Sequence, residues 1–295
     1  MRVPRRALRL LLALAVLGAI AAIALGISGC GSSGVSFDAV AQAADATSAT
    51  GGVHMQFTMQ ISSDALASSV TATGQGFYNY KTREGSISLE MNGLPASSAA
   101  LPSGTLQIEE LMKPSTIYVG SPLFSERLPN GARWMKIDLE QVGGALGMNL
   151  ASSTNGQSNP AEFLEYLRAD GGDVSSLGQE VVDGVTTTHY RGTIDVQKLV
   201  QTLPQAERNK LKPELEQVAP QGIPFDAWID QHHLVRRMAM TFSIDQGGQS
   251  ARMQFTVDLS EFGPTPPVQA PAESEVYDGT QAALQGLGAA AASSG

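Results

Sequence analysis

Apolar and polar residues alternate without a break over residues 53–62. The segment reads Val53-His54-Met55-Gln56-Phe57-Thr58-Met59-Gln60-Ile61-Ser62, so every odd-numbered side chain is apolar and every even-numbered one is polar. Successive side chains of a β-strand point to opposite faces, and this period of two therefore predicts a strand with one dry and one wet face. A chain that contains such a strand needs a sheet whose dry face is covered by other elements.

Further segments with strand character follow along the chain, and short links join most of them. They cover residues 71–80, 85–91, 106–110, 114–119, 132–139, 176–182, 185–195, 224–230, 234–244 and 251–259. The link Asp183-Gly184 is typical of a two-residue hairpin turn. Helices are expected from Ser36 to about Gly51, at residues 160–169, and at residues 196–218 with interruptions by proline.

Short links between consecutive strands favour antiparallel pairing. We therefore expect an α+β fold: a large, curved antiparallel sheet of about ten or eleven strands, shaped as a half-barrel, with helices covering its concave face. Proline, alanine and glycine dominate residues 263–295. This composition predicts a disordered, unpacked tail with at most a weak helix over residues 279–292.

The N-terminal segment has the layout of a secretory signal peptide. Four arginines lie within the first nine residues, an apolar run covers residues 10–27, and Ile27-Ser28-Gly29-Cys30 follows. This ending resembles a bacterial lipobox, which implies removal of residues 1–29 and acylation of Cys30. The protein would then be held by lipid at the extracytoplasmic face of the cell membrane. The alternative is an uncleaved transmembrane anchor, for which an apolar run of roughly eighteen residues is at the lower limit.

Charge and cysteine content exclude several classes of function. The chain carries 28 acidic against 19 basic residues, for a formal net charge of −9, and removal of the arginine-rich segment would make it more negative. Such a protein is repelled by nucleic acid, so no nucleic-acid partner is expected. A single cysteine excludes an internal disulfide and a cysteine-based zinc site.

Motifs for catalysis, metals or cofactors are not recognised in the sequence. The four histidines His54, His189, His232 and His233 lack the spacing of metal ligands, and no nucleophile elbow or phosphate-binding glycine loop occurs. Asp226 and Asp230 could suggest acid–base chemistry, but their period of two on a strand favours solvated carboxylates, paired with Arg236 or Arg237 across the hairpin. We therefore expect neither enzymatic activity nor a cofactor.

The order of motifs in the second half resembles a known family. The hairpin reads Val182-Asp183-Gly184-Val185-Thr186-Thr187-Thr188-His189-Tyr190, and Pro224-Phe225-Asp226-Ala227-Trp228-Ile229-Asp230 and Leu234-Val235-Arg236-Arg237 follow. This order resembles the actinobacterial LppX/LprG-type lipoproteins, whose fold is like that of the LolA and LolB carriers. The resemblance spans roughly residues 37–262 and implies a LolA-like domain at 36–262. The signal peptide at 1–29 and a lipidated tether at 30–35 precede this domain, and the tail at 263–295 is a departure from the family.

The resemblance also implies an apolar cavity between the sheet and its helices that holds acyl chains. Candidates for its wall come from the dry faces of the predicted strands and are rich in methionine, which adapts to variable apolar shapes. They are Met55, Phe57, Met59, Ile61, Ile87, Leu89, Met91, Met238, Met240 and Phe242. An ordinary packed core is the alternative interpretation of the same residues.

Two hypotheses for function follow from the resemblance. In the first, the protein is a lipid-anchored carrier that binds, and shuttles, a lipid, glycolipid or other hydrophobic ligand, with an envelope transporter or another envelope protein as a further partner. In the second, the same fold has a filled core and acts as a non-enzymatic interaction or sensor lipoprotein. A contiguous apolar cavity favours the first, and a core packed without voids favours the second.

Overall fold

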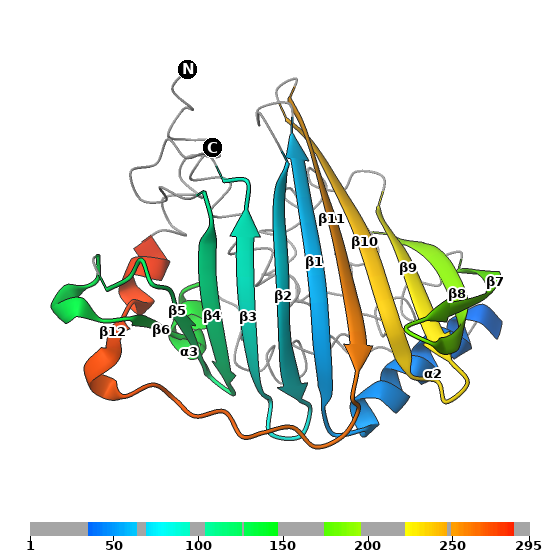
Figure 1. Ribbon diagram of the computed structural model, residues 1–295, viewed down its shortest axis with the longest axis horizontal. Coiled ribbons are helices and arrows are strands. Elements are labelled where there is room, and N and C mark those ends of the chain that lie inside the picture. Colours follow the sequence, from blue (N-terminus) through cyan, green and yellow to red (C-terminus); the bar gives the residue numbers. More distant parts are fainter. Residues whose placement is uncertain are drawn as a thin grey trace.

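The computed structural model describes residues 35–63, 69–94, 104–125, 127–146, 174–195, 222–246 and 249–285 (Figure 1). The predicted signal peptide, Cys30 and the helices expected at residues 160–169 and 196–218 lie outside these ranges. The described chain forms one 12-stranded sheet with few helices. The predicted fold class, a large antiparallel sheet accompanied by helices, is confirmed.

The elements follow one another in the order helix, six strands, helix, five strands, and a last short strand. They are α2 (Val35–Ala49), β1 (Val53–Ser63), β2 (Val70–Asn79), β3 (Glu84–Asn92), β4 (Leu106–Lys113), β5 (Thr116–Gly120), η1 (Pro129–Gly131), β6 (Trp134–Asp138), α3 (Leu139–Leu146), β7 (Ser175–Val182), β8 (Val185–Ile194), β9 (Ile223–Asp230), β10 (Val235–Gln246), β11 (Gln249–Ser260), η2 (Glu273–Glu275) and β12 (Val276–Asp278). Leu139, expected to close a strand, instead begins α3.

Two antiparallel meanders and the parallel edge strand β12 make up the sheet, whose strand order is β12-β6-β5-β4-β3-β2-β1-β11-β10-β9-β8-β7. Strands β1 to β6 form the first meander and β7 to β11 the second, and the pairing of β1 with β11 joins them. The predicted Asp183-Gly184 turn links β7 to β8, with both residues at positive φ as such a hairpin turn requires. The two strands next to the centre are therefore contributed by opposite ends of the domain.

Helix α2 packs its small apolar stripe against the second meander. Val40, Ala43, Ala44 and Thr47 are all fully buried, a spacing that places them on one helical face. The backbone N–H of Val235 donates to the Thr47 hydroxyl over 3.1 Å, which ties the last turn of the helix to the start of β10. After this turn Gly51, at φ 91°, reverses the chain into β1.

Residues 261–280 form an extended segment, here called the strap, which crosses one end of the first meander (Figure 1). The Gly263 N–H donates to the Gly52 carbonyl over 2.9 Å, and the Asn79 amide donates to the Thr265 hydroxyl over 3.1 Å. Val268 is buried, and β12 at the far end pairs in parallel with β6. The prediction of an unpacked tail is therefore wrong for residues 263–285, while residues 286–295 lie outside the described chain.

The strap is extended because its partners are remote strand ends rather than its own neighbours. Its prolines and small residues cannot form a core of their own, but backbone groups along it find partners on the sheet. The Arg133 N–H donates to the Glu275 carbonyl and the Asp138 N–H to the Thr280 hydroxyl, each over 3.0 Å. Thr280 then begins a short helical stretch, residues 280–285, within the range where a weak helix was expected.

Candidate functional site

The ten candidate wall residues lie on one face of three strands, β3, β1 and β10, with β2 and β11 between them. Paired residues of neighbouring strands point to the same face, so the register arranges them in rows. The rows are Ile87 and Met55; Leu89, Phe57 and Met238; Met91, Met59 and Met240; and Ile61 and Phe242, joined by paired apolar or glycine residues of β2 and β11. We call these ten residues the apolar wall.

Burial separates the wall into two hydrophobic clusters. Met55 and Met238 belong to the larger cluster, which α2 residues join. Met59, Ile61, Leu89 and Met91 belong to a second cluster, whose described buried members all come from strands β1 to β4. The remaining wall residues, Phe57, Ile87, Met240 and Phe242, are partly buried and pack against these clusters. The wall is thus continuous across the seam where the two meanders meet.

A glycine keeps the middle of the wall flat. A Cβ atom at Gly74 would lie 2.2 Å from the Cζ atom of Phe57, so the Phe57 ring lies across the β2 backbone at this point. Such a close approach is one of the reasons that a strand interior tolerates glycine.

Glu110 is a charged residue type on the same face as the wall. It pairs with Ile87 of β3 on one side and with Val119 of β5 on the other. Its side chain is 7% exposed, and its Oε1 atom has no hydrogen-bond partner among the residues that the structure describes. Burial raises the pKa of the Glu110 carboxyl from 4.5 to about 7. Sequence reasoning missed this residue, although it interrupts the apolar alternation of Leu106, Ile108 and Met112.

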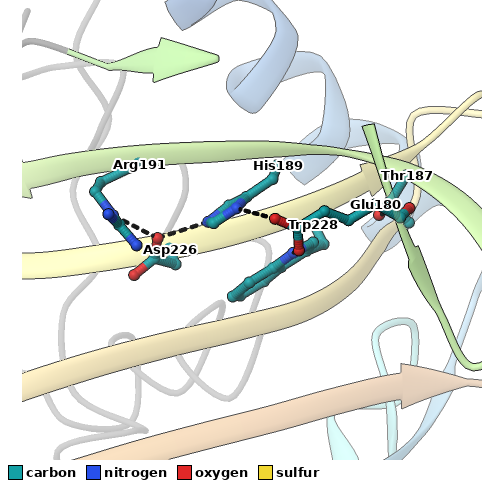
Figure 2. Close-up of polar contacts among 6 residues, drawn as sticks. All are labelled: Glu180, Thr187, His189, Arg191, Asp226 and Trp228. Atoms are coloured by element: carbon teal, nitrogen blue, oxygen red, sulfur yellow. Dashed lines mark hydrogen bonds and ion pairs between the residues drawn. The ribbon is translucent and has the colours of Figure 1, made fainter. Parts of the chain in front are cut away.

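The opposite face of the sheet, here called the polar face, carries a hydrogen-bonded cluster centred on His189 (Figure 2). The Nδ1 atom of His189 lies 2.9 Å from Oε1 of Glu180, and its Nε2 atom lies 2.6 Å from Oδ1 of Asp226. Arg191 donates from Nε to the same Asp226 oxygen over 2.8 Å. Each nitrogen of the His189 ring thus faces a carboxylate oxygen.

Trp228 completes this cluster from β9. Its indole N–H donates to Oε2 of Glu180 over 2.7 Å, and its ring stacks on the His189 ring. The hydrogen bonds from Trp228 and His189 lower the pKa of the Glu180 carboxyl. The cluster lies on the opposite side of the sheet from the apolar wall, with the backbone of the sheet between them.

The two aspartates and two arginines that we expected to pair do so only in part. Asp230 is buried, and Arg236 binds it with both Nε and Nη2 at 2.7 Å, which confirms one predicted pair. Arg237 instead pairs with Asp258 of β11, because a bulge between Val235 and Arg237 shifts the register of β10 against β9. The prediction that Asp226 and Asp230 are solvated is wrong for Asp230, whose side chain is 2% exposed.

A pocket of about 220 Å³ opens on the polar face over β3, β4 and β5. Its polar lining includes Ser88, Glu90, Gln107, Glu109 and Arg133. Of the ten wall candidates, Leu89 alone is part of its lining. Among the described residues, no group of three or more histidine, cysteine, aspartate or glutamate side chains could hold a metal ion.

The described helices include none that is both long and apolar enough to cross a bilayer.

His54 lies on the polar side of β1, 3.8 Å from a Glu261 oxygen, and His232 and His233 occupy the exposed turn after β9, as the sequence predicts. The four histidines therefore lie in three separate places.

Solved structures with a similar fold include two mycobacterial proteins. The chain is similar to lipoprotein LppX of Mycobacterium tuberculosis, with 17% identity and a TM-score of 0.42, over 81% of this chain and 100% of LppX. It is also similar to LprF of Mycobacterium bovis, with 15% identity and a TM-score of 0.42, over 80% of this chain and 97% of LprF.

A curated relative comes from Streptomyces griseus, an uncharacterized 31.2 kDa protein in the rplA-rplJ intergenic region. It is 30% identical to this chain over 162 residues, which are 53% of this chain and 51% of the relative. The match thus spans about half the length of either protein. No protein-family model matches the chain.

Proposed function

We propose that the apolar wall binds the acyl chains of a lipid or another hydrophobic ligand, and that the protein carries this ligand while anchored by lipid on Cys30 at the extracytoplasmic face of the membrane. One observation carries the proposal. The ten candidates, chosen from three separate sequence segments, lie in register on a single face of the sheet, on strands β3, β1 and β10.

The wall has the dimensions of an acyl chain. Five strands at about 4.8 Å spacing give a width of about 19 Å, and the six steps from Met55 to Ile61 along β1 give a length of about 20 Å. One leaflet is half of a hydrocarbon core of about 30 Å, so acyl chains in a membrane occupy about 15 Å each. An acyl chain therefore fits along the strands of the wall without bending.

The composition of the wall suits a ligand that enters and leaves. Met55, Met59, Met91, Met238 and Met240 supply flexible, polarizable side chains that can repack around chains of different length. Transfer of apolar surface to such a wall contributes about 25 cal/mol per Å², which offsets the loss of contacts in the bilayer. The proposed function consists of binding and release only, so it requires neither catalysis nor a cofactor.

The experiment that tests ligand binding is mass spectrometry of the lipids extracted from residues 31–295, purified after expression in a lipid-containing host. We expect stoichiometric lipid in the unaltered protein and a large loss of lipid in Met240→Glu, which places a charge on the wall. Thr241→Glu is the matched control, because Thr241 is the next residue of β10 and faces the polar side, opposite Gln254. A folded Met240→Glu protein with unchanged lipid content would contradict the proposal.

The lipid anchor has its own test. We expect Cys30→Ala in the full-length chain to prevent acylation, because acylation requires the thiol. The variant should then either leave the membrane fraction or keep its uncleaved signal peptide. Metabolic labelling with a fatty acid distinguishes a lipid anchor from a retained transmembrane segment, which would stay unlabelled.

The ligand experiment also tests the alternative hypothesis. A preparation of residues 31–295 that is folded and free of bound lipid would favour the interaction or sensor hypothesis instead.

A further inference from the structure

A single carboxyl group lies on the face of the apolar wall without a described partner. Glu110 occupies the row that holds Ile87 and Met55, two of the wall residues. Its neighbours on this face are Ile87 and Gly85 on β3, and Val119 and Ile117 on β5. These described neighbours bring no charged side chain to the Glu110 carboxyl.

An unpaired buried carboxyl is costly, and a protein core rarely keeps one without a reason. An ionised group in such surroundings carries a large desolvation penalty, and even a neutral polar group destabilises the fold when it lacks a hydrogen bond. Replacement by methionine would remove that cost at similar volume. The carboxyl therefore indicates a partner outside the residues that the structure describes.

We propose that Glu110 is the hydrogen-bonding anchor of the ligand site, and that its neutral carboxyl donates to an ester carbonyl of the bound lipid. This inference rests on the proposed function, and it adds one specificity-determining residue and one feature of the ligand. An ester carbonyl is a neutral acceptor that lies directly at the end of an acyl chain, so it can reach a carboxyl on the wall while the chain lies along the wall.

The surroundings of Glu110 favour a neutral acceptor over a cationic group. An ammonium headgroup would need an ionised carboxylate, and the described side chains beside Glu110 offer that ion pair no further hydrogen bonds. A neutral carboxyl needs one acceptor, which an ester oxygen provides. Binding through the protonated form also means that ligand affinity falls as the pH rises and the carboxyl ionises, since burial already raises the pKa of Glu110 to about 7.

The test compares two lipids that differ in the ester group alone. Phosphatidylcholine vesicles are loaded with a trace of radiolabelled diacylglycerol or of the matching dialkylglycerol ether, and uptake by residues 31–295 is measured from pH 5.5 to 8.5. Both lipids have the same chains and the same free hydroxyl. We expect at least a fivefold preference for the ester at pH 5.5 and loss of that preference at pH 8.5.

Three variants assign the preference to the residue. Glu110→Gln keeps a donor but cannot ionise, so the ester preference should persist at every pH. Glu110→Met should lose the preference at every pH while still binding both lipids. Glu109→Gln, which removes a neighbouring carboxylate from the exposed polar face, should behave as the unaltered protein.

The outcomes separate this inference from the proposed function. Equal uptake of ester and ether at every pH, or an ester preference that survives in Glu110→Met, would overturn the role of Glu110 and leave a lipid-binding wall in place. Selective uptake of a cationic amphiphile at high pH would overturn the neutral-acceptor assignment. No uptake of either lipid by the unaltered protein would instead overturn the proposed function itself.

Discussion

The imidazole of His189 lies flat on the indole of Trp228, with ring centroids 4.3 Å apart and ring planes 15° from parallel. Each ring also contacts Glu180, and His189 reaches across to Asp226 on the other side. This arrangement fastens the edge strand β7 to β8 and β9 by side chains in addition to the backbone ladder. Side-chain contacts on the polar face therefore hold β7 in the sheet, whereas packing on the apolar face contributes little to this strand.

We expect His189→Ala to lower the free energy of unfolding by about 2 kcal/mol, because it removes a buried ring and its contacts with Glu180 and Asp226. Urea unfolding at pH 7 measures the loss. His232→Ala is the control, since His232 lies on the exposed turn after β9 and should change stability very little. Equal effects of the two substitutions would contradict a structural role for the His189 cluster.

Asp230 should be among the most sensitive carboxylates of the chain. Burial raises the pKa of the Asp230 carboxyl. Hydrogen bonds from the Leu234 N–H, the Arg236 side chain and the His232 N–H lower this pKa by more, so the net value lies below the usual 3.8. We expect Asp230→Ala to cost about 3 kcal/mol at pH 7, because the Arg236 charge and two backbone donors lose their partner.

The sign of the pH dependence follows from the lowered pKa of Asp230. The stabilising contribution is complete above the unfolded value of 3.8 and is lost as the pH falls through the folded value. The difference between the unaltered protein and Asp230→Ala should therefore shrink below pH 4, as measured by thermal unfolding across pH 2–7. A difference that is constant over this range would contradict the assignment.

Glu110 should act in the opposite direction. A carboxyl whose pKa rises from 4.5 to about 7 on folding gives full stability below pH 4.5 and loses stability as the pH rises towards 7. In the lipid-free protein, we expect the advantage of Glu110→Met to grow by about 3 kcal/mol between pH 4 and pH 8. Parallel pH profiles of the two proteins would show that the carboxyl is solvated.

The strap should protect the outer strands of the first meander. A chain that stops after Gly263 loses β12, the buried Val268 and the hydrogen bonds to Arg133, Lys136 and Asp138. We expect a lower melting temperature and faster amide exchange in β5 and β6. The matched control is a chain that stops after residue 285 and keeps the whole strap, and it should retain slow exchange.

Most of the strands can be predicted from the sequence, because alternating residues and turn motifs within each segment are enough to identify them. The alternation over residues 53–62 gives β1 and its dry face, and Asp183-Gly184 gives the turn between β7 and β8. The strap and β12 could not be found in this way, because their partners are the ends of strands more than a hundred residues earlier. Composition alone describes such a segment as unpacked, although its backbone is paired with the sheet.

The candidate site residues could likewise be predicted only in part. Period-two patterns identify the ten wall residues, because each faces the side that its own strand makes dry. The His189 cluster needs the register of three strands, and the bulge in β10 that directs Arg237 to Asp258 has no clear local signal. Glu110 did have one, since a carboxylate stands where Leu106, Ile108 and Met112 predict an apolar side chain.

The pairing of β1 with β11 has a consequence for how this chain reaches its folded state. Ser62 and Arg252, which face each other across this pair, are 190 residues apart in sequence, while most other strand pairs are consecutive. Each meander can form from nearby contacts, whereas the central ladder closes a very long loop and should form late and slowly. A chain delivered through a membrane N-terminus first would thus remain open along its middle until its last long strand has emerged.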